Sequence, residues 1–432
     1  MRWYLCAAKP PHLFSFLGTI ILGAAVWIGI EQLRMNFPLG GMPWGNIAFS
    51  LTDSPLLSLA RFGSTQLIQF FAVIIGLCFV FMFFALRKRK VFPGVVLGFT
   101  AFLLIAAPLG IPNLKLSGPQ LKALVVQGNA PESFSGYMGG QRALEITENH
   151  VAATNAVFDQ EVDVVIWPES ASESDIRKDA DARRVFRKTL RLIGETPILL
   201  GTQEYFANKT RTNDYLVYAN GNIAGKYAKQ HPVPFGEYVP WRKTIGKYFT
   251  EIEQISTDMI PGTDAAQLTI PLKRELESGS GSNISRVVAG TPICFEVAFD
   301  QIVAEAALGA DFLIFPTNNS AFKRSGQAAQ QFAIAKLRAV EHGKTSVQAA
   351  VSGITGVINP NGIVAYQTDL FTTDARIVPV QLQAAQTFAT SSYQQRELLF
   401  YAFAILAAAV GLIRYVRFSG KLSSGADSDR QE

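Results

Sequence analysis

Three segments of this chain carry side chains whose types could do chemistry together. They read IWPES at 166–170, KYAKQHPVPFGEYVP at 226–240 and GTPICFEVAF at 290–299. Cys294 is a possible nucleophile, and a thiol that attacks a carbonyl needs a base to take its proton. Glu169, held in a partly apolar pocket, could be that base, while a lysine ammonium and the backbone N–H of Phe295 could stabilise the oxyanion. The three segments therefore indicate covalent catalysis through a thiol.

Each of these residues also has a purely structural interpretation. A lone cysteine in a strand is often a small core residue, and Glu169 could be an acid favoured by the dipole at a helix N-terminus. Lys229 could be a solvated loop lysine. His231 is interpreted as a structural loop residue. The chain has four histidines without close pairing, and this spacing does not predict a metal site. The chemical interpretation depends on other parts of the chain.

The elements that would position these side chains follow an alternating pattern. Runs of β-branched residues bounded by turns predict strands, and the amphipathic stretches between them predict helices. The predicted strands are 121–127, 162–167, 197–202, 215–219, 287–295, 312–317, 346–351 and 356–359. The predicted helices are 140–158, 175–193 and 325–342. This pattern is typical of an α/β domain, and Glu169 and Cys294 each fall at a strand end, where sites gather in such domains.

The composition is that of a membrane protein. The chain has 432 residues, of which 49% are hydrophobic and 17% charged, whereas soluble proteins carry about 25% charged residues. The apolar excess lies in 1–116 and 397–416, while 117–390 has an ordinary globular composition. The net charge is +5 and no large basic block is present, so nucleic acid is not an expected partner. Three cysteines do not make a disulfide framework, and they leave the redox compartment open.

Four apolar segments are long enough to predict transmembrane helices. They lie at about 13–30, 66–86, 91–111 and 397–416. The first could be a signal peptide, but a retained helix is favoured because the segment is long and aromatic and EQLR after it is a poor cleavage site. Glu31 and Arg34 are expected to end this helix. The Pro- and Gly-rich segment 36–60 is either a loop or an interfacial segment. In the second case Phe37, Pro43, Trp44 and Phe49 could enter the headgroup region.

The charges beside these segments predict one topology. Cytoplasmic loops of membrane proteins are enriched in lysine and arginine. The basic residues in question are Arg2, Lys9, Arg87, Lys88, Arg89, Lys90, Arg414, Arg417 and Lys421. With all of them inside, residues 117–390 are extracytoplasmic, and 417–432 form a polar cytoplasmic tail, of which we expect 419–432 to be disordered.

The order of the motifs matches a known family. WPES, KQHPVPFGEYVP, GTPICFE and TNNSAF (317–322) follow one another as in the nitrilase (carbon–nitrogen hydrolase) superfamily. With its flanking apolar helices the chain resembles the apolipoprotein N-acyltransferase family, which acts last in bacterial lipoprotein maturation. EQLR at 31–34 with the stretch after it, and QGN at 127–129, resemble the same family. The resemblance implies an α/β fold, a nitrilase-like αββα sandwich at 117–390, with about three transmembrane helices before it and one after.

The resemblance also assigns roles to individual residues. Glu169 would be the general base and Cys294 the nucleophile. Lys229 would be the catalytic lysine in preference to Lys226, because the family's lysine precedes the FGE glutamate by eight residues. Four further residues match supporting positions: Glu237, which would orient the lysine or the leaving group, Phe295 and Glu296 after the cysteine, and the membrane-side Arg34.

The chain departs from the family pattern in three places. The family usually has about eight helices and this sequence predicts four, so we expect a shortened N-terminal membrane part or a natural start upstream of Met1. The segment after QGN lacks a tryptophan often found there, which could alter the substrate entrance. TNNSAF replaces the commoner SNDAWFG but keeps an asparagine.

The resemblance implies a two-step reaction in the bacterial inner membrane. Cys294 would take an acyl chain from a phospholipid as a thioester, and the α-amino group of the S-diacylglyceryl cysteine of an apolipoprotein would then receive it. No metal or soluble cofactor is implied. Two alternatives remain: a membrane-anchored carbon–nitrogen hydrolase (amidase) that uses water as acceptor, and a non-catalytic scaffold for a partner membrane enzyme.

Overall fold

The chain folds into two structural units. The computed structural model describes residues 13–130, 139–245, 255–277 and 283–428. The helical unit consists of Met1–Pro112 and Ser392–Glu432, and the α/β unit consists of Asn113–Ser391. Arg2 and Lys9, and most of the segment that follows QGN, lie outside the described residues.

The α/β unit contains two β-sheets packed face to face. The first sheet has the order β13-β1-β2-β3-β4-β5, with β6 paired to β4, and the second has the order β12-β11-β10-β9-β8-β7. In the first sheet the bounds are β1 Gln120–Gln127, β2 Val164–Ile166, β3 Ile198–Tyr205, β4 Thr210–Ala219, β5 Asn222–Ala228, β6 Asp258–Met259 and β13 Asp374–Gln381. In the second they are β7 Gln267–Glu277, β8 Asn283–Gly290, β9 Phe312–Thr317, β10 Ser346–Ala350, β11 Gly356–Ile358 and β12 Val364–Gln367.

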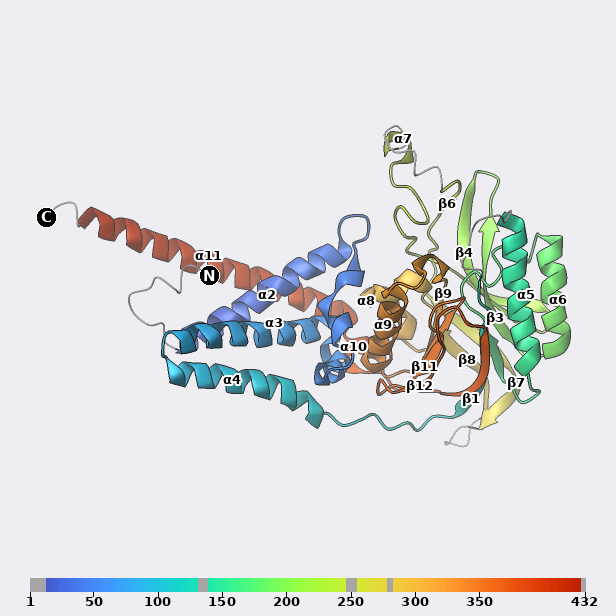
Figure 1. Ribbon diagram of the computed structural model, residues 1–432, viewed down its shortest axis with the longest axis horizontal. Helices are drawn as coiled ribbons and strands as arrows, with labels where there is room; N and C mark the ends of the chain where they lie inside the picture. Colours follow the sequence, from blue (N-terminus) through green and yellow to red (C-terminus); the bar gives the residue numbers. More distant parts are fainter. Residues whose placement is uncertain (1–12, 131–138, 246–254, 278–282, 429–432) are drawn as a thin grey trace. The chain divides into compact units, whose positions relative to one another are not determined.

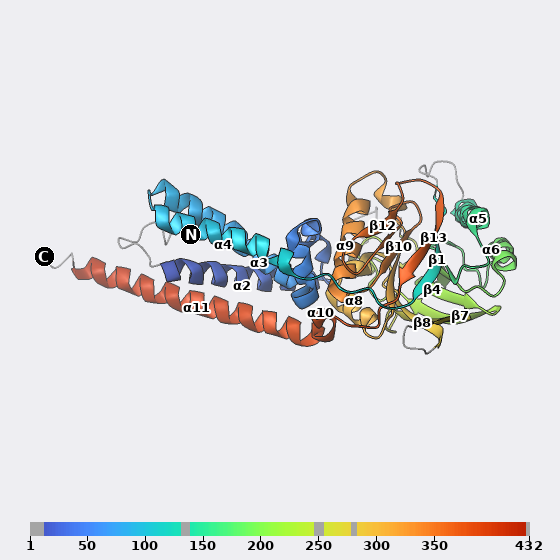
Figure 2. The same ribbon diagram turned by 90° about the horizontal axis from the view of Figure 1, so that it is seen from below.

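Helices cover the outer face of each sheet. Helices α5 (Gly139–Val157) and α6 (Ala180–Ile193) pack on the first sheet, and α8 (Asp300–Ala307) and α9 (Gln327–His342) pack on the second (Figures 1 and 2). Two short helices complete the unit, α7 Arg242–Ile245 and α10 Phe388–Ser391. The predicted αββα sandwich is confirmed.

Every predicted strand of the α/β unit has a counterpart, but several strands were not predicted. The missed strands are β5, β6, β7, β12 and β13. Strand β6 has only two residues. The other four are polar on at least one face and have few β-branched runs, so their sequences resemble loops. The predicted helix 175–193 begins only at Ala180, because the Asp179 side chain accepts a hydrogen bond from Ala182 N (2.8 Å) and caps the helix there.

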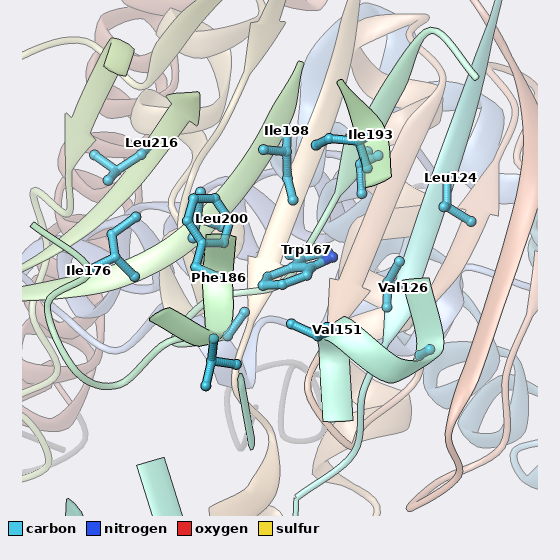
Figure 3. Close-up of a cluster of buried hydrophobic side chains, with 14 of the residues drawn as sticks. Leu124, Val126, Val151, Trp167, Ile176, Phe186, Ile193, Ile198, Leu200 and Leu216 are labelled. Atoms are coloured by element: carbon cyan, nitrogen blue, oxygen red, sulfur yellow. The ribbon is translucent and has the colours of Figure 1, made fainter. Parts of the chain in front are cut away.

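An apolar core between the first sheet and its helices anchors one of the three motif segments. Trp167 is fully buried in it, meets the Phe186 ring edge-on at 5.9 Å between centroids, and donates its indole N–H to Thr154 Oγ1 (2.9 Å) (Figure 3). The Tyr215 hydroxyl donates to the carbonyl of Trp167 (2.8 Å). Burying each large apolar side chain contributes about 1.5–3 kcal/mol. The backbone two residues before Glu169 is therefore firmly held.

Among the described residues, the helical unit contains four helices that are long and apolar enough to cross a membrane, as predicted. They are α2 Leu13–Asn36, α3 Ala60–Arg87, α4 Val91–Ala106 and α11 Tyr393–Ser428. Two boundaries were predicted wrongly. Helix α2 continues through Glu31 and Arg34, since these residues pair with each other one turn apart on the helix (2.7 Å) and need not end it. Helix α11 runs to Ser428, where the sequence predicted a disordered tail.

The segment between α2 and α3 is more ordered than a loop. It forms three short 3₁₀ helices, η1 Pro43–Gly45, η2 Ile47–Leu51 and η3 Pro55–Leu59. Phe37 is 66% exposed and could enter a headgroup region, but Phe49 is 6% exposed. The expectation that Phe49 reaches lipid is therefore wrong, because this side chain belongs to the core.

Candidate active site

Cys294 lies in a tight turn after a strand, so the predicted strand 287–295 extends too far at its C-terminal end. Strand β8 ends at Gly290, and Cys294 is the first residue of a 3₁₀ helix, η6 (Cys294–Ala298). Pro292, which lacks an N–H, cannot continue the strand ladder. The backbone of Cys294 has φ 54°, a left-handed conformation that costs a residue other than glycine about 1–3 kcal/mol. Such strain is typical of positions where a side chain is presented for function.

Glu169 follows the short strand β2 and is buried, with 4% of its surface exposed. Its Oε1 accepts a hydrogen bond from Asn213 Nδ2, and its Oε2 accepts one from Asn318 N, both at 2.6 Å. A close backbone approach makes this position possible. A Cβ on residue 201 of the neighbouring strand would lie 2.5 Å from Glu169 Cα, so glycine is required at Gly201.

Lys229 is the first residue after β5, and its side chain is completely buried. The ammonium lies 2.7 Å from Glu237 Oε1 and 3.6 Å from Glu169 Oε1. Lys226, the rival lysine, has a 42% exposed side chain and pairs with Glu204 at 3.2 Å instead. The structure therefore brings Lys229, and not Lys226, to Glu169.

Glu237 holds the lysine from the other side. Its Oε2 accepts a hydrogen bond from Val233 N (2.7 Å), which closes the turn of the PFGE segment. The opposite oxygen is the one bound to Lys229. One buried ammonium thus lies between two carboxylates, which fix its direction.

Glu296 joins the lysine segment to the cysteine turn. Its fully buried carboxylate accepts four hydrogen bonds: from Gln230 N (2.6 Å), His231 N (2.9 Å), the Tyr227 hydroxyl (2.9 Å) and Ile293 N (2.7 Å). Because all four hydrogen bonds come from protein groups, we assign this carboxylate a structural role, and not that of the base. Phe295 is 7% exposed and packs edge-on against Phe299, with 5.2 Å between ring centroids.

The buried charges alter the proton affinities of the three groups. Burial raises the pKa of Glu169, against the opposing effect of the Lys229 charge and of the hydrogen bonds from Asn213 and Asn318. Burial alone would lower the pKa of Lys229, but Glu237 and Glu169 outweigh it and raise the pKa, so the lysine stays charged. Burial and the Glu169 charge raise the pKa of the Cys294 thiol to about 12. The thiol is therefore protonated at neutral pH, and its attack needs a base.

Sequence reasoning missed two side chains of this site. Asn213 was overlooked because the predicted strand began at Tyr215, whereas β4 begins at Thr210 and carries Asn213 next to Glu169. The Thr317 hydroxyl is hydrogen-bonded to the Cys294 thiol and donates to Asn319 Oδ1 (2.6 Å). A polar Asn-Asp pair directly before the apolar run 215–219 is the signal that could have pointed to Asn213.

Arg34 lies in the helical unit. Its guanidinium forms two hydrogen bonds with Glu31 on α2, at 2.7 and 3.1 Å, and a third with the Met42 carbonyl. Its side chain is 36% exposed. Among the residues that the structure describes, no cluster of three or more His, Cys, Asp or Glu side chains could hold a metal ion.

The arrangement can support covalent acyl chemistry. Glu169 and Lys229 come from the ends of β2 and β5 in the first sheet, and Cys294 comes from the turn after β8 in the second. The site thus offers a thiol as nucleophile, a carboxylate as base and an ammonium as partner for an oxyanion. These three groups define a class of enzymes that form a covalent intermediate on a cysteine.

Comparison with known proteins is consistent with this class. Residues 140–390 match the carbon–nitrogen hydrolase family, and residues 2–78 match the apolipoprotein N-acyltransferase N-terminal domain. This chain therefore belongs to the carbon–nitrogen hydrolase family.

Several relatives are named apolipoprotein N-acyltransferase. The protein of that name from Mycolicibacterium smegmatis is 30% identical over 357 residues, which cover 75% of this chain and 56% of the relative. The one from Pseudomonas syringae pv. tomato is 27% identical over 81% of this chain and 66% of its own. The one from Shewanella oneidensis is 26% identical over 93% of this chain and 74% of its own. The chain thus spans less than two thirds of the length of the first two.

Among solved structures, amidases of the nitrilase superfamily from Nesterenkonia AN1 are similar to this chain. A cysteine-to-alanine mutant of that amidase is 15% identical, with a TM-score of 0.44, and the match covers 66% of this chain and 100% of the amidase.

Proposed function

We propose that this protein is an N-acyltransferase of lipoprotein maturation. It moves an acyl chain from a membrane phospholipid, through a thioester on Cys294, to the α-amino group of the S-diacylglyceryl cysteine of an apolipoprotein. The observation that carries the proposal is the buried Lys229, held between Glu169 and Glu237, in a chain that also has four apolar helices. The names of the relatives support the choice of substrates.

In the first step the thiol attacks the ester carbonyl of the phospholipid. The Cys294 proton passes to the Glu169 carboxylate while the C–S bond forms, since a thiol with a pKa of about 12 cannot supply thiolate unaided. The Lys229 ammonium stabilises the oxyanion. The C–O bond then breaks, and the departing lysophospholipid oxygen takes the proton from Glu169.

In the second step the amine of the apolipoprotein attacks the thioester. Glu169 accepts a proton from the attacking nitrogen, the C–S bond breaks, and the proton passes to the departing sulfur, so that the thiol is restored. Glu237 keeps the ammonium pointed at the reacting carbonyl through its 2.7 Å contact with Lys229. Neither step uses a metal or a soluble cofactor.

We further propose that the protein is a multi-pass protein of the bacterial inner membrane with the α/β unit outside the cytoplasm. The basic residues 87–90 between α3 and α4, and the basic residues in α11 from Arg414 onward, support this orientation by the positive-inside rule. Residues 417–432 then lie on the cytoplasmic side. Arg34 is proposed to act on the membrane side of the entrance for lipid.

The deciding experiment is complementation of cells that lack lipoprotein N-acylation, read by mass spectrometry of a lipoprotein N-terminus. The unchanged protein should restore the third acyl chain, and Cys294→Ala and Cys294→Ser should abolish it while the protein still inserts. Cys78→Ala is the matched control, because Cys78 is a buried cysteine of the helical unit and should be dispensable.

Two results would overturn the proposal. If purified protein hydrolyses small amides but never takes an acyl group from phospholipid, the protein is an amidase. If Cys294→Ala supports normal lipoprotein maturation, the chain acts as a scaffold for another membrane enzyme. Acyl-enzyme labelling with a phospholipid whose acyl chain is radioactive distinguishes the acyltransferase from both alternatives.

A further inference from the structure

A buried arginine lies directly against the turn that carries Cys294. Arg338 on α9 is fully buried, and its Nε donates to the Val297 carbonyl (2.8 Å) while its Nη2 donates to the Ala298 carbonyl (2.9 Å). These are the last two carbonyls of η6, the five-residue helix that begins at Cys294. The terminal carbonyls of a helix have no partner within the helix, so the guanidinium satisfies them.

Two acidic side chains fix the guanidinium in this position. Asp300 Oδ1 lies 2.7 Å from Nη2, and Glu341 Oε2 lies 2.5 Å from Nη1. Glu341 is itself fully buried, and Asp300 has a 13% exposed side chain. A guanidinium is a planar fork of donors and can therefore bind two carbonyls and two carboxylates at once, which an ammonium cannot do with the same geometry.

The cysteine turn is consequently held at both of its ends. Glu296 binds Ile293 N immediately before Cys294, and Arg338 binds the carbonyls that end the turn. Between these anchors Cys294 keeps a left-handed backbone with φ 54°. A strained conformation persists only where its surroundings impose it. The contact with Arg338 is one such constraint.

We propose that Arg338 is a positioning residue for the nucleophile: it holds η6 so that the Cys294 sulfur stays aligned with Glu169 and Lys229. The inference rests on the proposed function only in taking Cys294 as the nucleophile. Arg338 contacts the turn through the backbone carbonyls of Val297 and Ala298. Its effect passes through the backbone of the turn.

The test compares two buried cations, Arg338 on α9 and Lys344 just beyond it. Arg338→Lys keeps the charge but not the fork, and Arg338→Met removes both. The matched control is Lys344→Met, because Lys344 is fully buried just beyond α9 and donates to the Gln383 carbonyl, away from the cysteine turn. Full-length protein in phospholipid vesicles is used for the rate of acyl-enzyme formation, its dependence on phospholipid concentration, and thermal unfolding.

Arg338→Lys should slow acyl-enzyme formation by about 100-fold, the effect of displacing a reacting group by roughly 1 Å. The phospholipid concentration for half-maximal rate should not change. Lys344→Met should lower the unfolding temperature at least as much while its rate stays within about threefold of the unchanged protein. Alkylation of Cys294 by iodoacetamide, located by mass spectrometry, should slow in Arg338→Lys and not in Lys344→Met.

The inference is overturned if Arg338→Lys forms acyl-enzyme at the normal rate, or if both variants lose rate in proportion to their loss of stability. If neither Arg338 variant can be purified, Asp300→Asn loosens the same guanidinium, and a normal rate in that variant also overturns the inference. Failure of the proposed function looks different, because the unchanged protein would then form no acyl-enzyme from phospholipid either.

Discussion

A substitution at Gly201 would displace Glu169, the proposed base, without changing the Glu169 side chain itself. Gly201 lies on β3, and an added Cβ would stand 2.5 Å from Glu169 Cα and 2.4 Å from Ser170 N. Ordinary van der Waals contact begins at 3.4 Å. The backbone that carries Glu169 must therefore move by roughly 1 Å in Gly201→Ala, which is the displacement that costs about 100-fold in rate.

The displacement should cost more in rate than in stability. Overpacking of a core typically costs about 1–3 kcal/mol, which lowers the unfolding temperature but leaves a folded protein. The 2.6 Å hydrogen bonds from Asn213 and Asn318 to the Glu169 carboxylate, in contrast, do not survive a shift of that size with good geometry. We therefore expect folded Gly201→Ala protein that takes acyl from phospholipid about 100-fold more slowly.

The assay is pre-steady-state formation of the acyl-enzyme from a phospholipid with a labelled acyl chain, with thermal unfolding measured on the same preparation. Gly326→Ala is the control, because Gly326 has φ −67° and a Cβ there would meet nothing within 4 Å. It should stay within about twofold of the unchanged protein. A normal rate in Gly201→Ala would show that the position of Glu169 does not limit acylation, and would refute the reasoning.

Three further outcomes are expected. Lys229→Ala should abolish acyl-enzyme formation while Lys226→Ala keeps most of it, since only Lys229 lies at Glu169; the opposite pattern would exclude Lys229. The unchanged protein should lose its acylation rate on acidification as Glu169 is protonated. The hydrogen bond from Asn213 lowers the pKa of Glu169, so its loss in Asn213→Ala should raise that pKa and move the midpoint to higher pH. An unmoved midpoint would argue against Glu169 as the base. Trp167→Ala should cost about 3–5 kcal/mol of unfolding free energy, measured by denaturant titration, and a cost below about 1 kcal/mol would contradict the importance of this core.

The architecture could be predicted from local sequence patterns, because strands that are buried on both faces have clear apolar runs. Strands β2 and β9 consist entirely of buried residues, and their apolar runs were predicted. Edge strands such as β5 and β12 consist mostly of exposed or half-buried residues and were missed. A sequence pattern records burial more directly than it records hydrogen bonding between strands.

Motif order was enough to propose Glu169, Lys229 and Cys294, but not the groups that orient them. Asn318 acts through its backbone N–H, so its residue type carries little signal. Gly201 must be glycine only because Glu169 Cα comes close to it in the folded chain, and the sequence does not show this contact. The left-handed backbone of Cys294 could not be predicted, because the apolar run before this residue predicts a strand. Arg338 lies 44 positions after Cys294 in the sequence, and its contact with the cysteine turn exists only in the folded chain.

The placement of the site on both sheets limits how this protein can change during evolution. Cys294 follows a strand of one sheet, and Glu169 and Lys229 follow strands of the other, so the distances among them depend on the spacing between the sheets. Gly225 and Leu268 help to set this spacing, because a Cβ added at Gly225 would lie 3.2 Å from Leu268 Cδ2. Such residues therefore affect the alignment of reacting groups as well as the packing. Substitutions in this interior that are harmless to folding should still be removed by selection on activity, and surface positions should accumulate most of the sequence divergence.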